Sequence, residues 1–178
     1  MIDFIFYSEK YREVVEELGK MLSPKFPDLV KLNKFTAQHV RCPMQILMAM
    51  DDDVVIGFVL SFYVRAEIND TYRSSSKCVI ASFIKPEYRG KGYGELMLMD
   101  DIRLGKCIVL SNPMATAEEQ KRMRKFYEDK YLWRTNVTMT DPDKNVYELF
   151  ARGRFVQEEL DAFGRTIQEI WDRFVKCC

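Results

Sequence analysis

The chain has 178 residues, of which 47% are hydrophobic and 30% are charged, and its 27 basic side chains balance its 27 acidic ones. This length and composition are typical of one globular domain and argue against a disordered chain, because 12 Phe, 9 Tyr and 10 Met can build a core. A net charge of zero gives no general attraction to nucleic acids or acidic membranes, so we expect neither as a partner.

The five cysteines and the single histidine, His39, are spread along the chain without a CxxC pair. This spacing predicts neither a disulfide framework nor a zinc site, so we expect no metal cofactor. No window approaches the run of about 18 apolar residues that a membrane-spanning helix needs. Together these features predict a cytoplasmic protein that does not span a membrane.

The N-terminal part of the chain predicts one strand and two helices. Residues 2–7 form a short apolar run that is typical of a strand. Ser8 stands where it can cap a helix over residues 11–22, in which apolar residues recur at helical spacing. Pro24 ends this helix, and residues 28–39 predict a second, weaker one.

Alternating apolar runs and polar turns then predict antiparallel strands. Residues 45–50 and 54–64 read as two strands joined by the turn Asp51-Asp52-Asp53. A second polar turn over residues 69–77, which contains three consecutive serines, precedes a strand over residues 78–84.

The rest of the main domain continues this alternation of strands and helices. Thr116 is followed three residues later by Glu119, which is the signature of a capping box at the start of a helix. The predicted elements are helices over 95–104 and 116–130 and strands over 107–111, 132–139 and 146–150.

The C-terminal residues 153–178 predict an amphipathic helix, because apolar side chains stand three or four residues apart. These side chains are Phe155, Val156, Leu160, Phe163, Ile167, Ile170, Trp171 and Phe174. We therefore expect a main domain over residues 1–152 with an added helix. Packing of this helix on its own domain, a homodimer interface and an interface with another protein all remain open.

One segment of the sequence has the pattern of a ligand-binding loop. The sequence Arg89-Gly90-Lys91-Gly92-Tyr93-Gly94 lies between the strand that ends at Ile84 and a predicted helix. Glycines let successive backbone N–H groups approach an anion, and the positive end of the following helix adds attraction. The Walker A pattern is absent, and Glu95 stands where a dinucleotide fingerprint needs its last glycine. The segment predicts a site for phosphate or pyrophosphate.

The segment fits the pattern Q/R-x-x-G-x-G, and with the order of elements over residues 2–150 it resembles the GNAT superfamily of N-acetyltransferases. This resemblance implies an α/β (α+β) fold, in which helices flank a mixed, mostly antiparallel sheet, with the C-terminal helix as an addition. It also implies acetyl-CoA as co-substrate and direct transfer of its acetyl group to a primary amine. The amine belongs to a small molecule or to a protein.

The resemblance assigns the cofactor-binding residues. In proteins similar to this one, the loop amides grip the CoA pyrophosphate, and the preceding strand splays from its neighbour to pair its backbone with the pantetheine arm. The loop positions are Arg89, Gly90, Lys91, Gly92, Tyr93 and Gly94, and the strand positions are Ser82, Phe83 and Ile84.

A second stretch resembles the family pattern F-Y-x-x-x-G-F. Here Tyr127 matches the tyrosine that protonates the departing CoA thiolate, and its alternative role is packing in the core. Tyr131 occupies the usual glycine position, so we expect the chain to leave this helix differently. Glu119 stands where the family often has a cofactor-binding asparagine, and Asn112 is the candidate to replace it.

The base that would deprotonate the amine is not evident. The strand over residues 78–84 holds no acidic residue, which leaves Glu67 and Asp70 as nearby candidates. The alternative hypothesis is therefore a GNAT-like protein that binds CoA or another protein without transferring an acetyl group.

Overall fold

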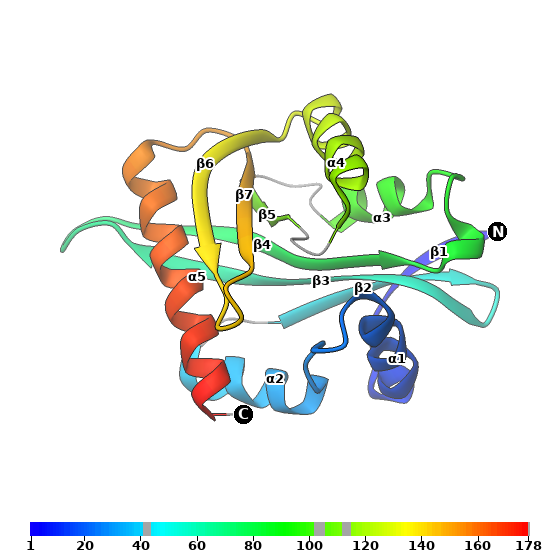
Figure 1. Ribbon diagram of the computed structural model, residues 1–178. Helices are drawn as coiled ribbons and strands as arrows, with labels where there is room; N and C mark the ends of the chain where they lie inside the picture. The colour runs from blue at the N-terminus through cyan, green and yellow to red at the C-terminus, as the bar shows by residue number, and fades with distance from the viewer. Residues whose placement is uncertain (41–43, 102–105, 112–114, 178) are drawn as a thin grey trace. The chain divides into compact units, whose positions relative to one another are not determined.

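The computed structural model describes residues 1–40, 44–101, 106–111 and 115–177 (Figure 1). The strands are β1 (Ile2–Phe6), β2 (Met44–Asp51), β3 (Val54–Glu67), β4 (Arg73–Ile84), β5 (Cys107–Leu110), β6 (Trp133–Thr140) and β7 (Val146–Arg152). The α-helices are α1 (Arg12–Leu22), α2 (Leu29–Phe35), α3 (Tyr93–Asp101), α4 (Ala117–Asp129) and α5 (Gln157–Cys177). Short 3-10 helices are η1 (Glu9–Tyr11) and η3 (Pro86–Tyr88), and η2 (Thr36–Val40) is a π-helix that follows α2.

The strands are hydrogen-bonded in the order β1-β2-β3-β4-β5-β7-β6. The pairs β1–β2, β2–β3, β5–β7 and β6–β7 are antiparallel, so the predicted α/β (α+β) class with a mostly antiparallel sheet is confirmed. The chain divides into two units, and β3 and β4 contribute to both. Unit 1 comprises Met1–Phe62 and Val79–Arg103, and unit 2 comprises Tyr63–Cys78 and Leu104–Cys178.

Unit 1 is built around the β2–β3 hairpin. Its register pairs Ala49 with Gly57 and Met50 with Val55, so Ile56 is an extra residue that makes a bulge in β3. Helices α1 and α2 lie on one side of these strands and α3 lies on the other (Figure 1). Phe58 of β3 is fully buried, with its ring centroid 5.4 Å from that of Phe26.

The helices of unit 1 begin in different ways. The prediction that Ser8 caps the first helix was wrong, because the turn η1 intervenes and the Ser8 side chain makes no capping hydrogen bond. Glu9 and Arg12 form an ion pair of 2.8 Å across this turn instead. Asp28 does cap α2, since its carboxylate accepts the Lys31 N–H at 2.9 Å.

The predicted polar turn over residues 69–77 is shorter in the structure, because β4 already begins at Arg73. Ser74 and Ser76 are 8% and 3% exposed, and the Ser76 hydroxyl donates to the Lys106 carbonyl at 3.2 Å. Asn69 organises the remaining turn by accepting the Tyr72 N–H at 2.8 Å. Serines that look like turn residues in the sequence therefore lie in a strand, because their hydroxyls find partners when buried.

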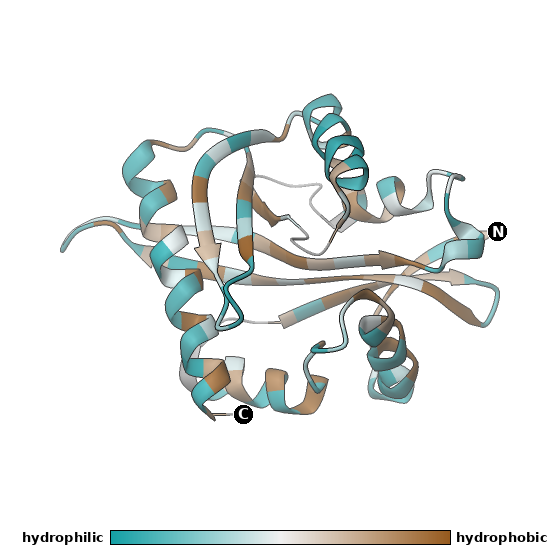
Figure 2. Ribbon diagram, viewed as in Figure 1, coloured by the Kyte–Doolittle hydropathy of each residue, from teal (hydrophilic) through white to brown (hydrophobic). Residues whose placement is uncertain are grey.

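Helix α5 packs against β6 in unit 2. A Cβ added to Gly164 would lie only 2.7 Å from Val137 Cγ1, which shows how closely the helix approaches the strand. The Gln168 side chain accepts the Thr140 N–H at 2.9 Å and donates to its carbonyl at 2.8 Å. Hydropathy follows this packing, since α5 alternates between hydrophobic and hydrophilic residues whereas α4 is mainly hydrophilic (Figure 2).

A buried carboxylate anchors the start of α5. Glu159 is 3% exposed, and it accepts hydrogen bonds from Lys106 Nζ at 2.9 Å, Tyr72 Oη at 3.1 Å and the Val156 N–H at 3.0 Å. Burial by itself would raise the pKa of Glu159, but these bonds and one from Ser74 outweigh it and lower the pKa to about 2. The carboxylate is therefore ionised at neutral pH and joins three separate segments of unit 2.

Candidate functional site

The glycine-rich segment connects β4 to α3 in unit 1. Gly90 and Gly92 have φ values of 77° and 80°, in the left-handed region that glycine adopts without strain. A Cβ added at either position would meet nothing within 4 Å, so the space beside the backbone is open. Left-handed residues that alternate with ordinary ones can turn successive N–H groups to one side, as in known anion sites.

Helix α3 begins inside this segment. Its first turn is closed by the hydrogen bond from the Leu96 N–H to the Gly92 carbonyl, at 3.0 Å. The opening N–H groups of an α-helix have no acceptor within the helix, and its dipole places partial positive charge there. The two left-handed glycines of the loop therefore directly precede the first turn of α3.

The two basic side chains of the loop, Arg89 and Lys91, lie over aromatic rings. Arg89 Cζ is 5.4 Å from the ring centroid of Phe83, and Arg89 Nε donates to the Ile84 carbonyl at 3.0 Å. Lys91 Nζ is 5.3 Å from the ring centroid of Tyr88. Partial burial and a hydrogen bond with the Asp51 carboxylate raise the pKa of Tyr88, so this ring stays neutral beneath the lysine.

The end of β4 approaches β3 closely. A Cβ added to Gly57 would lie 2.5 Å from the Phe83 carbonyl oxygen, and the Lys85 N–H donates to the Ile56 carbonyl at 2.9 Å. Phe83 is 5% exposed, whereas Ser82 is exposed. The predicted strand and loop positions, from Ser82 to Gly94, thus lie together in unit 1, and Asn112 lies outside the described residues.

Tyr127 belongs to unit 2 and lies on α4. It is 5% exposed, and its ring centroid is 4.8 Å from that of Phe150 and 5.7 Å from that of Phe126. Burial raises the pKa of Tyr127 above its ordinary value of 10.0, so the phenol keeps its proton at neutral pH. The side chain can act as a proton donor, and it also packs in the core as the alternative interpretation expects. Met123, at 42% exposed, does not share this core.

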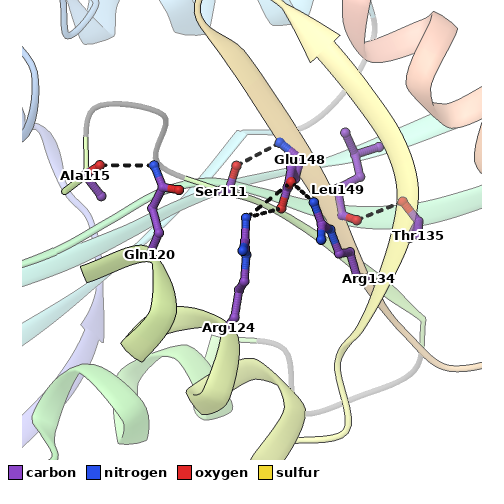
Figure 3. A network of polar contacts seen from close by, with 8 residues as sticks. All are labelled: Ser111, Ala115, Gln120, Arg124, Arg134, Thr135, Glu148 and Leu149. Atoms are coloured by element: carbon purple, nitrogen blue, oxygen red, sulfur yellow. Dashed lines mark hydrogen bonds and ion pairs between the residues drawn. The ribbon is translucent and has the colours of Figure 1, made fainter. Parts of the chain in front are cut away.

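A polar network that sequence reasoning missed connects α4 to the strands of unit 2 (Figure 3). The Glu148 carboxylate of β7 accepts hydrogen bonds from Arg134 of β6 and, at 3.4 Å, from Arg124 of α4. The Glu148 N–H donates to Ser111 Oγ at 2.7 Å. Arg124 stands one helical turn before Tyr127, so the network ties the helix that carries Tyr127 to two strands. Its sequence signal is a carboxylate within the apolar run of the last strand.

The family model of the Acetyltransferase (GNAT) family matches residues 11–131 of this chain. The chain belongs to the GNAT family. A comparison with curated protein sequences finds no match.

Solved structures share the fold at low sequence identity. Arabidopsis thaliana NAA60 in complex with a bisubstrate analogue is 12% identical, with a TM-score of 0.61, over 85% of this chain and 98% of that one. PaiA N-acetyltransferase from Thermoplasma acidophilum in complex with coenzyme A is 15% identical, with a TM-score of 0.58, over 86% and 99%. A GNAT family acetyltransferase from Elizabethkingia anophelis with acetyl-CoA bound is 9% identical, with a TM-score of 0.58, over 86% and 98%.

The chain leaves α4 through a turn with the geometry that glycine usually provides, although Tyr131 stands at the glycine position. Tyr131 adopts φ = 62°, the conformation that a glycine would take there. The Leu132 N–H donates to the Tyr127 carbonyl at 2.9 Å, and the Tyr131 N–H donates to the Glu128 carbonyl at 3.1 Å. This is a Schellman motif, so the expectation that the chain leaves the helix differently was wrong. The tyrosine adopts glycine's geometry at an energetic cost.

Replacing Tyr131 with glycine is expected to raise the free energy of unfolding by about 1 kcal/mol, because a left-handed non-glycine residue is strained by about that amount. Tyr131 is 82% exposed, so few contacts are lost. Urea denaturation measures the change. Tyr131→Ala is the control, since alanine keeps the strain, and equal stability of the glycine and alanine variants would contradict the prediction.

Three further residues that the sequence analysis considered, Glu67, Asp70 and Glu119, lie in unit 2 of this GNAT chain. Glu67 forms an ion pair of 3.0 Å with Arg73, and Asp70 is exposed in the turn before β4. Glu119 accepts the Thr116 N–H at 2.9 Å and completes the predicted capping box. Among the described residues, no group of three His, Cys, Asp or Glu side chains is arranged to hold a metal ion.

Proposed function

We propose that this GNAT chain is an N-acetyltransferase that moves the acetyl group of acetyl-CoA directly to a primary amine. The observation that carries the proposal is the loop between β4 and α3, where two left-handed glycines with open space around them precede the first turn of a helix. Family membership supports the reaction class, and structures of similar fold contain CoA or acetyl-CoA.

In this proposal, the backbone N–H groups of residues 89–94 bind the pyrophosphate and Lys91 adds positive charge. The backbone of Ser82, Phe83 and Ile84 pairs with the pantetheine arm, because main-chain groups need no polar side chain for this.

The proposed reaction needs no covalent enzyme intermediate. The amine nitrogen attacks the thioester carbonyl carbon, backbone N–H groups stabilise the developing oxyanion, and the C–S bond breaks. Tyr127 gives its proton to the departing thiolate, and the amine loses a proton to water or to a base. The phenol then regains a proton from solvent, which balances the step.

Binding of acetyl-CoA is tested by thermal unfolding. At about 100 times its Kd, a ligand adds about 2.7 kcal/mol of stability, which for a chain of this size raises Tm by about 5 °C or more. Gly92→Glu is expected to abolish this shift, because it adds a carboxylate and a side chain where the pyrophosphate lies. Gly92→Ala is the matched control, because it introduces the same backbone strain without the carboxylate. This variant is expected to keep a smaller increase in Tm with acetyl-CoA.

Absence of any shift in the wild-type protein at saturating acetyl-CoA would contradict the proposal. A thiol-release assay with a panel of amines separates transfer from binding alone. Binding without release for every amine would favour the alternative, a GNAT-like protein that binds CoA without transfer.

None of the helices among the described residues is long and apolar enough to cross a membrane. We propose that the chain acts in the cytoplasm, as its cysteine spacing favours, and cell fractionation checks this.

A further inference from the structure

We propose that the Arg89 side chain positions the end of β4, and that its guanidinium does not act as a phosphate ligand. The inference rests on the proposed acetyl-CoA function and concerns how unit 1 presents the β4 backbone to the cofactor.

The peptide unit between Ile84 and Lys85 is held at both of its polar groups. Its carbonyl oxygen accepts the Arg89 Nε–H at 3.0 Å, and its N–H donates to the Ile56 carbonyl at 2.9 Å. A peptide unit is planar, so two bonds at its opposite groups fix its orientation. This unit lies at the end of β4 and contains the carbonyl of Ile84, the last of the three residues whose backbone is proposed to pair with pantetheine.

The guanidinium of Arg89 is anchored by the same segment. It lies 5.4 Å from the ring centroid of Phe83, which is 5% exposed and packs 6.4 Å from the ring centroid of Phe58. A cation over a ring and a directed Nε–H bond hold one side chain at two points. Arg89 therefore connects the buried core of unit 1 to the last carbonyl of β4.

The family pattern agrees with this role. It accepts glutamine or arginine at this position, and glutamine carries no charge. The property that the two side chains share is an N–H donor on a flexible stem. A residue whose task is to neutralise phosphate would need the charge, whereas a residue that holds a carbonyl needs only the donor.

The test compares two ligands and two variants by calorimetry. Acetyl-CoA contains pantetheine, whereas adenosine 3′-phosphate 5′-diphosphate keeps the diphosphate and lacks the pantetheine arm. Arg89→Leu is expected to weaken acetyl-CoA binding by about tenfold, the factor that corresponds to one lost hydrogen bond of this kind, and to leave the diphosphate probe within about threefold. Arg89→Gln keeps a donor and is expected to bind both ligands within about threefold of the wild type.

Circular dichroism checks that both variants are folded, as expected for substitutions of an exposed side chain. Equal loss of both ligands in both variants would overturn the inference, because that pattern is expected of a phosphate ligand. An Arg89→Leu variant that binds acetyl-CoA like the wild type would overturn it as well. Failure of the wild-type protein to bind acetyl-CoA would instead overturn the proposed function.

Discussion

Replacing Glu159 with glutamine is expected to lower the free energy of unfolding by about 3 kcal/mol at pH 7, because the carboxylate is buried and accepts several hydrogen bonds. Its pKa changes from the ordinary 4.5 to about 2 in the folded chain, a difference that corresponds to about 3 kcal/mol. A neutral amide cannot keep the ion pair with Lys106, whose Nζ lies 2.9 Å from the carboxylate. Urea denaturation followed by circular dichroism measures the loss.

The effect has a defined pH dependence. A carboxylate whose folded pKa is lowered contributes its full stability above its unfolded value of 4.5 and loses it as the pH falls towards about 2. The difference between wild type and Glu159→Gln should therefore be largest at neutral pH and shrink between pH 4.5 and 2.

Glu158→Gln is the matched control, because this neighbour in the first turn of α5 is exposed. Its stability is expected to stay within about 0.5 kcal/mol of the wild type. Equal urea midpoints for the two variants would contradict the structural role of Glu159. The result also bears on residues 153–178, which we propose are an integral part of the fold and not only a partner surface.

Replacing Tyr127 with phenylalanine is expected to lower kcat by about 100-fold, the usual minimum contribution of a general acid. The aromatic ring that packs 4.8 Å from Phe150 is retained, so folding should be preserved and the KM for acetyl-CoA should change little. Burial raises the pKa of Tyr127, so wild-type kcat should not fall through loss of this proton below about pH 10. A thiol-release assay over a pH series measures the loss of kcat in the variant and the pH dependence of kcat in the wild type.

Tyr131→Phe is the matched control, because it also removes a tyrosine hydroxyl but does so from a side chain that is 82% exposed. It is expected to leave kcat unchanged. If Tyr127→Phe also keeps the wild-type kcat, Tyr127 is a packing residue alone, and the alternative interpretation of its role holds.

Local signals predicted much of the fold and the loop of the candidate site. The Thr116–Glu119 capping box and the hairpin turn at Asp51-Asp52-Asp53 are found as expected, since they depend on residues close in sequence. The glycine-rich connection between β4 and α3 was also expected from neighbouring residues, and the structure adds that Gly90 and Gly92 are left-handed. The serines of β4 were misplaced because their burial depends on Lys106, about thirty residues away.

The sequence by itself determined the family resemblance, the order of the elements and the place of the glycine-rich loop, because each depends on short-range pattern. Only the tertiary structure showed that Arg89 turns back to a backbone carbonyl, that Glu159 meets Lys106, and that Glu148 receives two arginines. These contacts join segments whose approach is set by packing of the whole core. A charged residue in the sequence indicates which kinds of group its side chain can bind, and the fold determines which of those groups lies within reach.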